Sequence, residues 1–286
     1  MDWIKAKKII VLMLIILNLF LLGLNVQNRK SYSLSPSQEK AIFDVLNKNN
    51  IGIYTDLVEK YPPMRQITVR SSSLNSNDLT SAFFSDSEKV SMTTEFSKTI
   101  YRSQSKTLTL ENNMILFENQ NGEGAIPNLT RDAALEKADS FLSGLTILPK
   151  SFLLESVTPI AGGYEFYYNE IFHDYKIFSN YCKITVTEKG VVSAEINRYE
   201  AEGFTGDKRE LAAPDEILLT FLYELKKQEQ YSGVIINSFE LGYDFQEKAD
   251  IAEGSRPRLV PCYRIFIDGS DTPYIINAYT NEIKKD

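Results

Sequence analysis

The stretch KKIIVLMLIILNLFLLGLNVQNRK, residues 7–30, decides the architecture of this chain. From Ile9 to Val26 there are 18 residues without a charge, and most of them are Leu, Ile or Val. A helix of that length covers roughly 27 Å, close to the ~30 Å hydrocarbon core of a bilayer. A cleaved signal peptide is the alternative, but the exit LGLNVQ offers neither a small-x-small cleavage site nor a Cys for lipid attachment. The sequence therefore predicts an uncleaved, single-pass signal-anchor over residues 9–26.

The flanks of this run predict its orientation. Eight residues precede it and 260 follow it, and a short N-terminus ordinarily stays inside while a long domain is exported. Three basic residues before the run and two after it give only a weak charge bias. The expected membrane-interface anchors are Trp3, Lys5, Lys7 and Lys8. We therefore expect a cell-membrane protein with residues 1–8 in the cytoplasm and an extracytoplasmic C-terminal region.

Two amides interrupt the apolar run. Asn18 and Asn25 are seven residues apart, so they share one helix face with Leu14 and Leu21. An amide in lipid is costly without a partner and often hydrogen-bonds to another helix. The face of Leu14, Asn18, Leu21 and Asn25 is therefore a candidate partner contact. The alternative is that Asn25 lies among the headgroups and Asn18 is tolerated.

The charge of the remaining chain limits its partners. After residue 30 the sequence carries 26 Lys and Arg against 37 Asp and Glu. An acidic domain is a poor nucleic-acid binder, because phosphate contacts dominate that affinity. The two cysteines, Cys182 and Cys262, are too few for a disulfide framework. We expect two buried thiols, although a pair between them stays open.

Composition and helix signals divide the exported part. A tether over 27–34 leads to an N-terminal α+β domain over 35–121, and a Gly- and Asn-rich linker follows at 122–129. Two further α+β repeats are expected at 130–210 and 211–286. Each reads as one helix followed by antiparallel strands, with the last hairpin packed on the helix. The predicted fold class is α+β.

Helix-start chemistry is clear at three positions. Ser35, Pro36 and Gln38 form a capping box with Pro at the first turn. Thr130 can cap a helix that stops at Gly144, and Pro214 begins another. The expected buried positions of these three helices are Ile42, Val45, Leu46; Ala134, Leu135, Ala138, Phe141, Leu142; and Ile217, Leu218, Phe221, Leu222, Leu225.

Strands are expected between these helices. The segment MRQITVR predicts one strand, NDLTSAFF a short helix, and residues 89–119 two or three strands. The first repeat predicts strands at YEFYY, YKIF, YCKITVT and VVSAEI. The second predicts NSFELGYDF, PCYRIFID, PYIINAYT and, after a turn at Asn281, IKK. The aromatic-rich run YEFYYNEIFHDYKIFSNY is expected to form core and cross-strand pairs, with a peptide or glycan platform as the alternative.

No residue pattern predicts catalysis. The single histidine, His173, is expected in a turn beside Asp174, without a nucleophile or orienting partner nearby. One His and two distant Cys make no zinc site, and there is no phosphate loop or nucleophile elbow. We expect no enzyme activity, no cofactor and no metal. An anchored hydrolase built from carboxylates of distant segments is left open.

The start of the chain resembles the YycI family. Met1, Asp2 and Trp3 are followed by Lys5 and the run Asn18–Leu22. The segments VLNKNNIGIYTDLVEKYPPM and PCYRIFIDGSDTPYIINAYTNEI are similar to that family too. The ending also resembles a PepSY-type hairpin, with Asn281 where Gly is usual; Asn tolerates the same left-handed turn.

This resemblance implies a regulator without catalysis. YycI-like proteins act on the WalK–WalR two-component system of cell-wall metabolism. Expected partners are a WalK-like sensor histidine kinase and a YycH-like protein, reached through transmembrane and extracytoplasmic contacts. The last two repeats are then PepSY-like or YycH-like. The alternative is a membrane-anchored extracellular binding or protease-inhibiting PepSY-like module.

Overall fold

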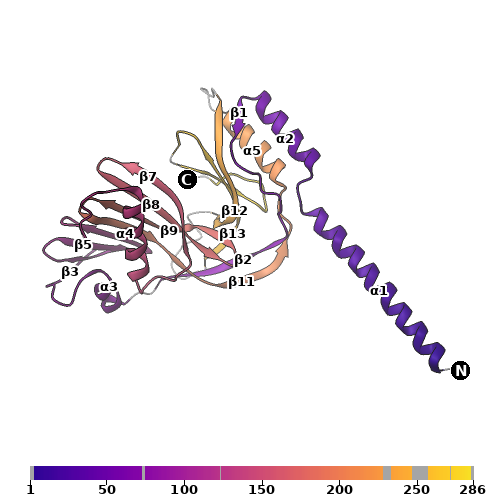
Figure 1. Ribbon diagram of the computed structural model, residues 1–286, viewed down its shortest axis with the longest axis horizontal. Helices are drawn as coiled ribbons and strands as arrows, with labels where there is room; N and C mark the ends of the chain where they lie inside the picture. Colours follow the sequence, from indigo (N-terminus) through magenta and orange to yellow (C-terminus); the bar gives the residue numbers. More distant parts are fainter. Residues whose placement is uncertain are drawn as a thin grey trace. The chain divides into compact units, whose positions relative to one another are not determined.

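A computed structural model describes residues 3–72, 75–122, 124–227, 233–246, 257–270 and 272–284. The chain forms two compact units (Figure 1). The first unit contains residues 1–65, 206–241 and 261–286, and the second contains 66–205 and 242–260. Each unit is therefore assembled from segments that are far apart in the sequence. The predicted domain and repeat boundaries remain a prediction.

The two N-terminal helices belong to the first unit. They are α1 (Trp3–Ser31) and α2 (Pro36–Lys48). The predicted capping box of α2 is confirmed: the Ser35 hydroxyl accepts a hydrogen bond from the Gln38 backbone N–H, and the Gln38 side chain accepts one from the Ser35 N–H. Ile42 and Leu46 are buried, whereas Val45 is only half-buried. Local capping chemistry therefore sets where α2 begins.

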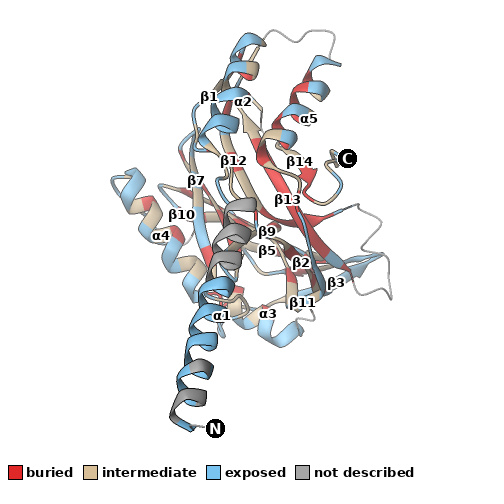
Figure 2. Cartoon of the chain, turned by 90° about the vertical axis from the view of Figure 1, so that its right-hand side faces the viewer, coloured by how far each residue is buried: buried red, intermediate tan, exposed pale blue. Residues whose placement is uncertain are grey.

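The rest of the first unit combines one helix with short strand pairs. Helix α5 (Pro214–Lys226) buries all five predicted positions, and α2 packs against α5 and against β1 (Ile51–Ile53). Strand β1 pairs in parallel with the start of β12 (Val234–Phe245). Strand β13 (Arg258–Ile267) pairs antiparallel with β14 (Tyr274–Asn277). The Phe221 ring of α5 contacts the Tyr274 ring of β14 at 5.0 Å, so β14 packs on this helix. Figure 2 shows buried residues along α5 and β13.

An antiparallel sheet dominates the second unit. Its strands lie in the order β7, β8, β9, β10, β6, β5, β4, β3. Their bounds are Phe152–Ile160, Gly163–Phe172, Tyr175–Thr187, Gly190–Asn197, Met114–Asn119, Lys106–Glu111, Lys98–Arg102 and Ser91–Glu95. Within the same unit, part of β2 (Met64–Ser71) pairs with the start of β13, and the end of β12 meets β9. The predicted α+β class is confirmed.

Two helices cover one face of this sheet. They are α3 (Ser76–Phe83) and α4 (Arg131–Gly144), and α4 packs on β8, β9 and β10. A row of directly paired, buried side chains crosses the sheet beneath them: Tyr101, Leu108, Phe117, Ala194, Ile184 and Phe166. Burying one such large apolar side chain contributes about 1.5–3 kcal/mol. This row is therefore the centre of the core of the second unit.

Several strand predictions need correction. Residues 89–119 form four strands, β3 to β6, rather than two or three. YKIF and YCKITVT belong to one strand, β9. Its residues 178–180 are skipped in the pairing with β8, opposite the step from Asn169 to Glu170, but they do not end the strand. In place of the predicted strand IKK there is a single bridge from Ile283 to Ile276. The strands β1, β7 and β11 (Tyr199–Arg209) were not predicted.

Both cysteines are buried and neither forms a disulfide, as expected. Cys182 is fully buried on β9, and burial strongly raises the pKa of its thiol. A thiol that stays protonated is a poor nucleophile. Cys182 therefore acts as a core residue of the second unit.

Candidate protein-interaction site

Helix α1 presents apolar side chains to its surroundings on all sides. From Ile10 to Leu21 its large apolar residues are between 51% and 68% exposed. An isolated helix that is apolar all round is covered by something other than water in its working state. No helix among the described residues meets the length and apolarity that crossing a membrane requires.

The predicted partner-contact stripe, made of Leu14, Asn18, Leu21 and Asn25, lies on this helix. Leu14 and Leu21 are exposed, and the Asn18 Nδ2 donates a hydrogen bond of 2.8 Å to the Leu14 carbonyl oxygen of the preceding turn. This bond uses one of the two amide hydrogens and lowers the cost of placing Asn in an apolar environment. The second hydrogen and the carbonyl oxygen can serve a neighbouring helix. The Asn25 side chain lies outside the described residues.

The predicted interface anchors lie at the start of the same helix. Trp3 is 79% exposed, and Lys7 and Lys8 are exposed too. The Lys5 side chain lies outside the described residues. An exposed indole next to ammonium groups is the usual chemistry of a membrane–water interface. This end of α1 therefore carries the residue types that an anchor needs.

The single histidine lies in the predicted turn. His173 and Asp174 connect β8 to β9, and both have positive φ, 46° and 70°. The imidazole contacts the rings of Phe172 at 4.6 Å and of Phe204 at 5.2 Å. Aromatic neighbours on both sides give the ring a packing role in this hairpin.

A buried polar network in the second unit was missed by sequence reasoning. The Asn180 amide donates to Glu170 Oε2 at 2.8 Å and to the Tyr199 carbonyl at 2.7 Å, and its oxygen accepts from the Tyr199 N–H. The Arg198 Nε lies 3.2 Å from Glu170 Oε2. Asn169 and Asn180 are fully buried, and Glu170 is nearly so. The network links β8, β9 and β11 at the irregular step of the β8–β9 pairing, so its role is architectural.

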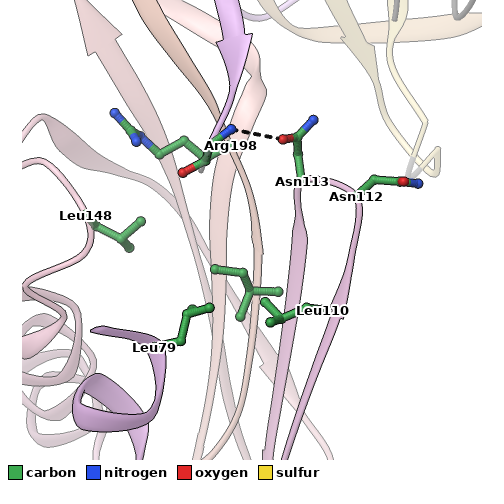
Figure 3. Close-up of a pocket in the computed structure, with 8 residues that line it drawn as sticks. Leu79, Leu110, Asn112, Asn113, Leu148 and Arg198 are labelled. Carbon is green, nitrogen blue, oxygen red and sulfur yellow. Dashed lines mark hydrogen bonds between the residues drawn. The ribbon is translucent and has the colours of Figure 1, made fainter. Parts of the chain in front are cut away.

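The second unit also contains a small cavity (Figure 3). It measures about 100 Å³ and has apolar walls that include Leu79, Leu110 and Leu148. Its polar rim comes from the β5–β6 turn at Asn112 and Asn113 and from Arg198, whose charge is already matched by Glu170. The cavity is smaller than the usual site for a drug-sized ligand. Among the described residues no group of three or more His, Cys, Asp or Glu could hold a metal ion.

The fold and the candidate site together define an α+β protein whose most distinctive surface is an exposed apolar helix. The chain belongs to the YycI family: the family described as YycI protein matches residues 29–279. This family indicates a regulator of the WalK two-component system and a regulatory rather than enzymatic protein. The match begins after the predicted anchor, so α1 has to be argued from its own residues.

Two solved structures are similar to this chain. A crystal structure of an uncharacterized protein from Eubacterium rectale has a TM-score of 0.57 at 15% identity, covering 83% of this chain and 91% of that one. The Bacillus megaterium YpeB C-terminal domain has a TM-score of 0.39 at 13% identity, covering 76% and 97%. The first likeness shows a shared fold. No curated protein matches the chain.

Proposed function

We propose that this protein is a non-catalytic, membrane-anchored regulator of a WalK-like sensor histidine kinase, acting together with a YycH-like partner. The observation that carries the proposal is the family match over residues 29–279. The uncharged run Ile9–Val26 and the exposed apolar surface of α1 support an anchor with a cytoplasmic N-terminus and an extracytoplasmic C-terminal region.

The mechanism is a shift of population between kinase states. A helix that packs better against one signalling state stabilises that state by the difference in packing free energy. Interhelical hydrogen bonds in membranes average about 0.6 kcal/mol each. Two amide contacts, from Asn18 and Asn25, therefore supply roughly 1 kcal/mol, or about a fivefold shift. That magnitude suits a modulator that adjusts a kinase rather than switching it completely.

The test replaces residues 9–26 by an unrelated single-pass helix of equal length. Membrane level and topology are checked first, and then the output of a kinase-dependent reporter and co-purification of the kinase are measured. The proposal expects reporter output equal to that of a deletion strain and no co-purification of the kinase. Normal output with the foreign helix would instead favour an extracellular binding or protease-inhibiting module on an exchangeable anchor.

A matched pair of variants isolates the stripe. Asn18→Leu with Asn25→Leu removes both amides. A second variant adds Leu19→Asn and Val26→Asn, which restores the composition but rotates the amides by about 100° around the helix. We expect both variants to lose the effect on the kinase. Full activity of the rotated variant would show that the amides are tolerated but contact no partner.

A further inference from the structure

The connection between α1 and α2 is short and partly buried. Helix α1 continues through Ser31 and α2 begins at Pro36, so residues 32–35 form the whole connection. All four of these residues are half-buried. A freely solvated linker would be exposed, so this segment lies against other parts of the first unit.

Two backbone hydrogen bonds show what the connection contacts. The Leu34 N–H donates to the Glu59 carbonyl oxygen at 2.8 Å. The Tyr61 N–H donates to the Tyr32 carbonyl oxygen at 3.1 Å. Both bonds join the connection to residues 59–61, which lie after α2 in the sequence and form an antiparallel bridge with it. The chain that leaves α1 is therefore paired like a short strand.

Side chains join the same region to a third segment, which precedes α5. The Tyr32 hydroxyl donates to Glu210 Oε1 at 3.0 Å. Just inside α2, Gln38 Nε2 donates to Asp215 Oδ2 at 3.4 Å. Glu210 and Asp215 belong to the first unit. The exit of α1 is thus held by two segments that are far apart in the sequence.

The segment that receives the connection is itself firmly placed. Tyr61 and Met64 are buried. Pro62 and Pro63 lie between them, and each proline ring fixes its backbone φ. The Tyr279 hydroxyl donates to the Met64 carbonyl oxygen at 2.9 Å. Residues 59–61 therefore continue into the core of the first unit.

We propose that the docked segment, residues 32–35, couples the anchor mechanically to the first unit. A Gly- or Ser-rich linker behaves as a random coil and passes on neither rotation nor displacement. A paired segment has fixed backbone dihedrals, so a movement of α1 is passed on to the residues that hold it. The inference rests on the proposed function, and it adds how the membrane contact of that regulator is linked to its extracytoplasmic region.

Disulfide formation in the purified full-length protein tests the docking. Ser33 and Lys60 are bridge partners, and the two backbone bonds flank this pair instead of joining it. Such pairs have Cα atoms about 4.5 Å apart, within disulfide reach. Ser33→Cys with Lys60→Cys should therefore cross-link within one chain under mild oxidation, because Cys182 and Cys262 are buried and do not compete.

The matched control for this cross-link is Ser33→Cys with Glu59→Cys. Neighbouring side chains of an extended segment point to opposite sides, so this pair should cross-link several-fold less. Mass spectrometry of the oxidised proteins measures both yields. An equal or lower yield in the pair with Lys60→Cys overturns the inference.

An insertion tests the coupling itself. Six Gly and Ser residues placed between Ser31 and Tyr32 give the anchor slack but keep the docked segment, which should still form the Ser33→Cys, Lys60→Cys disulfide. The kinase should still co-purify, because the membrane helix is unchanged, but reporter output should equal that of a deletion strain. The control is the same insertion between Ala161 and Gly162, in an exposed turn of the second unit, and should change neither readout.

The outcomes separate the coupling from the proposed function. Unchanged reporter output after the insertion at Ser31 overturns the coupling and leaves the proposed function standing. Equal loss of output from both insertions shows that slack in the anchor is not the cause, and overturns the coupling too. Failure of the kinase to co-purify with the unsubstituted protein overturns the proposed function, and this inference with it.

Discussion

Helices α1 and α5 are both rich in large apolar residues, but their surroundings are opposite. In α5, Ile217, Leu218 and Phe221 are fully buried. In α1, the apolar residues from Ile10 to Leu21 are all more than half exposed. The hydrophobicity of α5 is therefore explained by the chain itself. That of α1 is not explained by contacts among the described residues, which is why we propose α1 as an anchor and a contact surface.

The largest expected effect is on stability and comes from a substitution in the buried face of α5. Phe221→Ala removes a fully buried ring that contacts Tyr274, and should lower the free energy of unfolding by about 3–5 kcal/mol. Denaturant unfolding measures the change. Tyr223→Ala is the control, because Tyr223 is 66% exposed on the same helix, and it should change stability by less than about 0.5 kcal/mol. Equal losses in both variants would contradict the assignment of the two faces.

The second-largest expected effect is on membrane insertion and tests the exposed helix α1. Leu14→Lys should cost about 2.5–3.5 kcal/mol of membrane insertion if α1 spans the bilayer, because a charge at the centre of a span is unfavourable. Fractionation of cells measures the membrane-bound share. Leu219→Lys is the control: Leu219 is 46% exposed on α5, so membrane retention should not change. A greater loss of retention in Leu219→Lys than in Leu14→Lys would contradict α1 as the anchor.

How much of the fold the sequence predicts depends on whether its signal is local or non-local. Helices α2, α4 and α5 were predicted with their starts and most of their buried positions, because capping and 3.6-residue periodicity are local signals. The exceptions are only half-buried: Val45 of α2 and Leu135, Phe141 and Leu142 of α4. The parallel pairing of β1 with β12 joins Ile51 to Val234. Nothing in either segment encodes that partner, so non-local pairing and the composition of the two units could not be derived from local patterns.

The candidate sites also differ in whether the sequence alone predicts them. The stripe on α1 follows from spacing alone. The network around Asn180 does not, although two amides and a carboxylate inside aromatic strands, YYNEIF and FSNY, were a usable signal. Its members are brought together by β8, β9 and β11. The exposure of β3 likewise follows from its place at the end of the sheet, which residues 91–95 do not reveal by themselves.

A smaller effect compares how two helices of the first unit begin. Ser35 caps α2 through its hydroxyl, whereas α5 begins at Ala213, which has no side-chain acceptor. Ser35→Ala should lower stability by about 1 kcal/mol, and Ala213→Ser should raise it by up to about 1 kcal/mol. Thermal unfolding of both variants shows whether stability falls in Ser35→Ala and rises in Ala213→Ser. A loss from Ala213→Ser would contradict this expectation, because Glu216 accepts only from the Ala213 N–H, at 3.3 Å, and leaves the N–H groups of the first turn open to a Ser hydroxyl.

The smallest effect concerns the segment that leads from the covered core to the uncovered edge β3. Glu88 Oε1 lies 3.0 Å from Lys106 Nζ and accepts from the Ser85 N–H. Burial alone would raise the pKa of Glu88, but hydrogen bonds from Ser103, Ser85 and Lys106 lower it from 4.5 to about 2. A carboxylate with a depressed folded-state pKa stabilises the fold above its unfolded pKa. That contribution is lost as the pH falls from about 4.5 towards 2.

Glu88→Gln should therefore lower stability at neutral pH, by less than about 1 kcal/mol because solvent screens a group so near the surface. The difference from the unsubstituted protein should shrink below pH 4.5. Unfolding measured across this range tests both points. Glu111→Gln is the control, since the pair with Lys98 is more exposed and should contribute little at any pH. A pH-independent loss in Glu88→Gln would mean that Glu88 holds the loop before β3 by shape and hydrogen bonding, with its charge making no contribution.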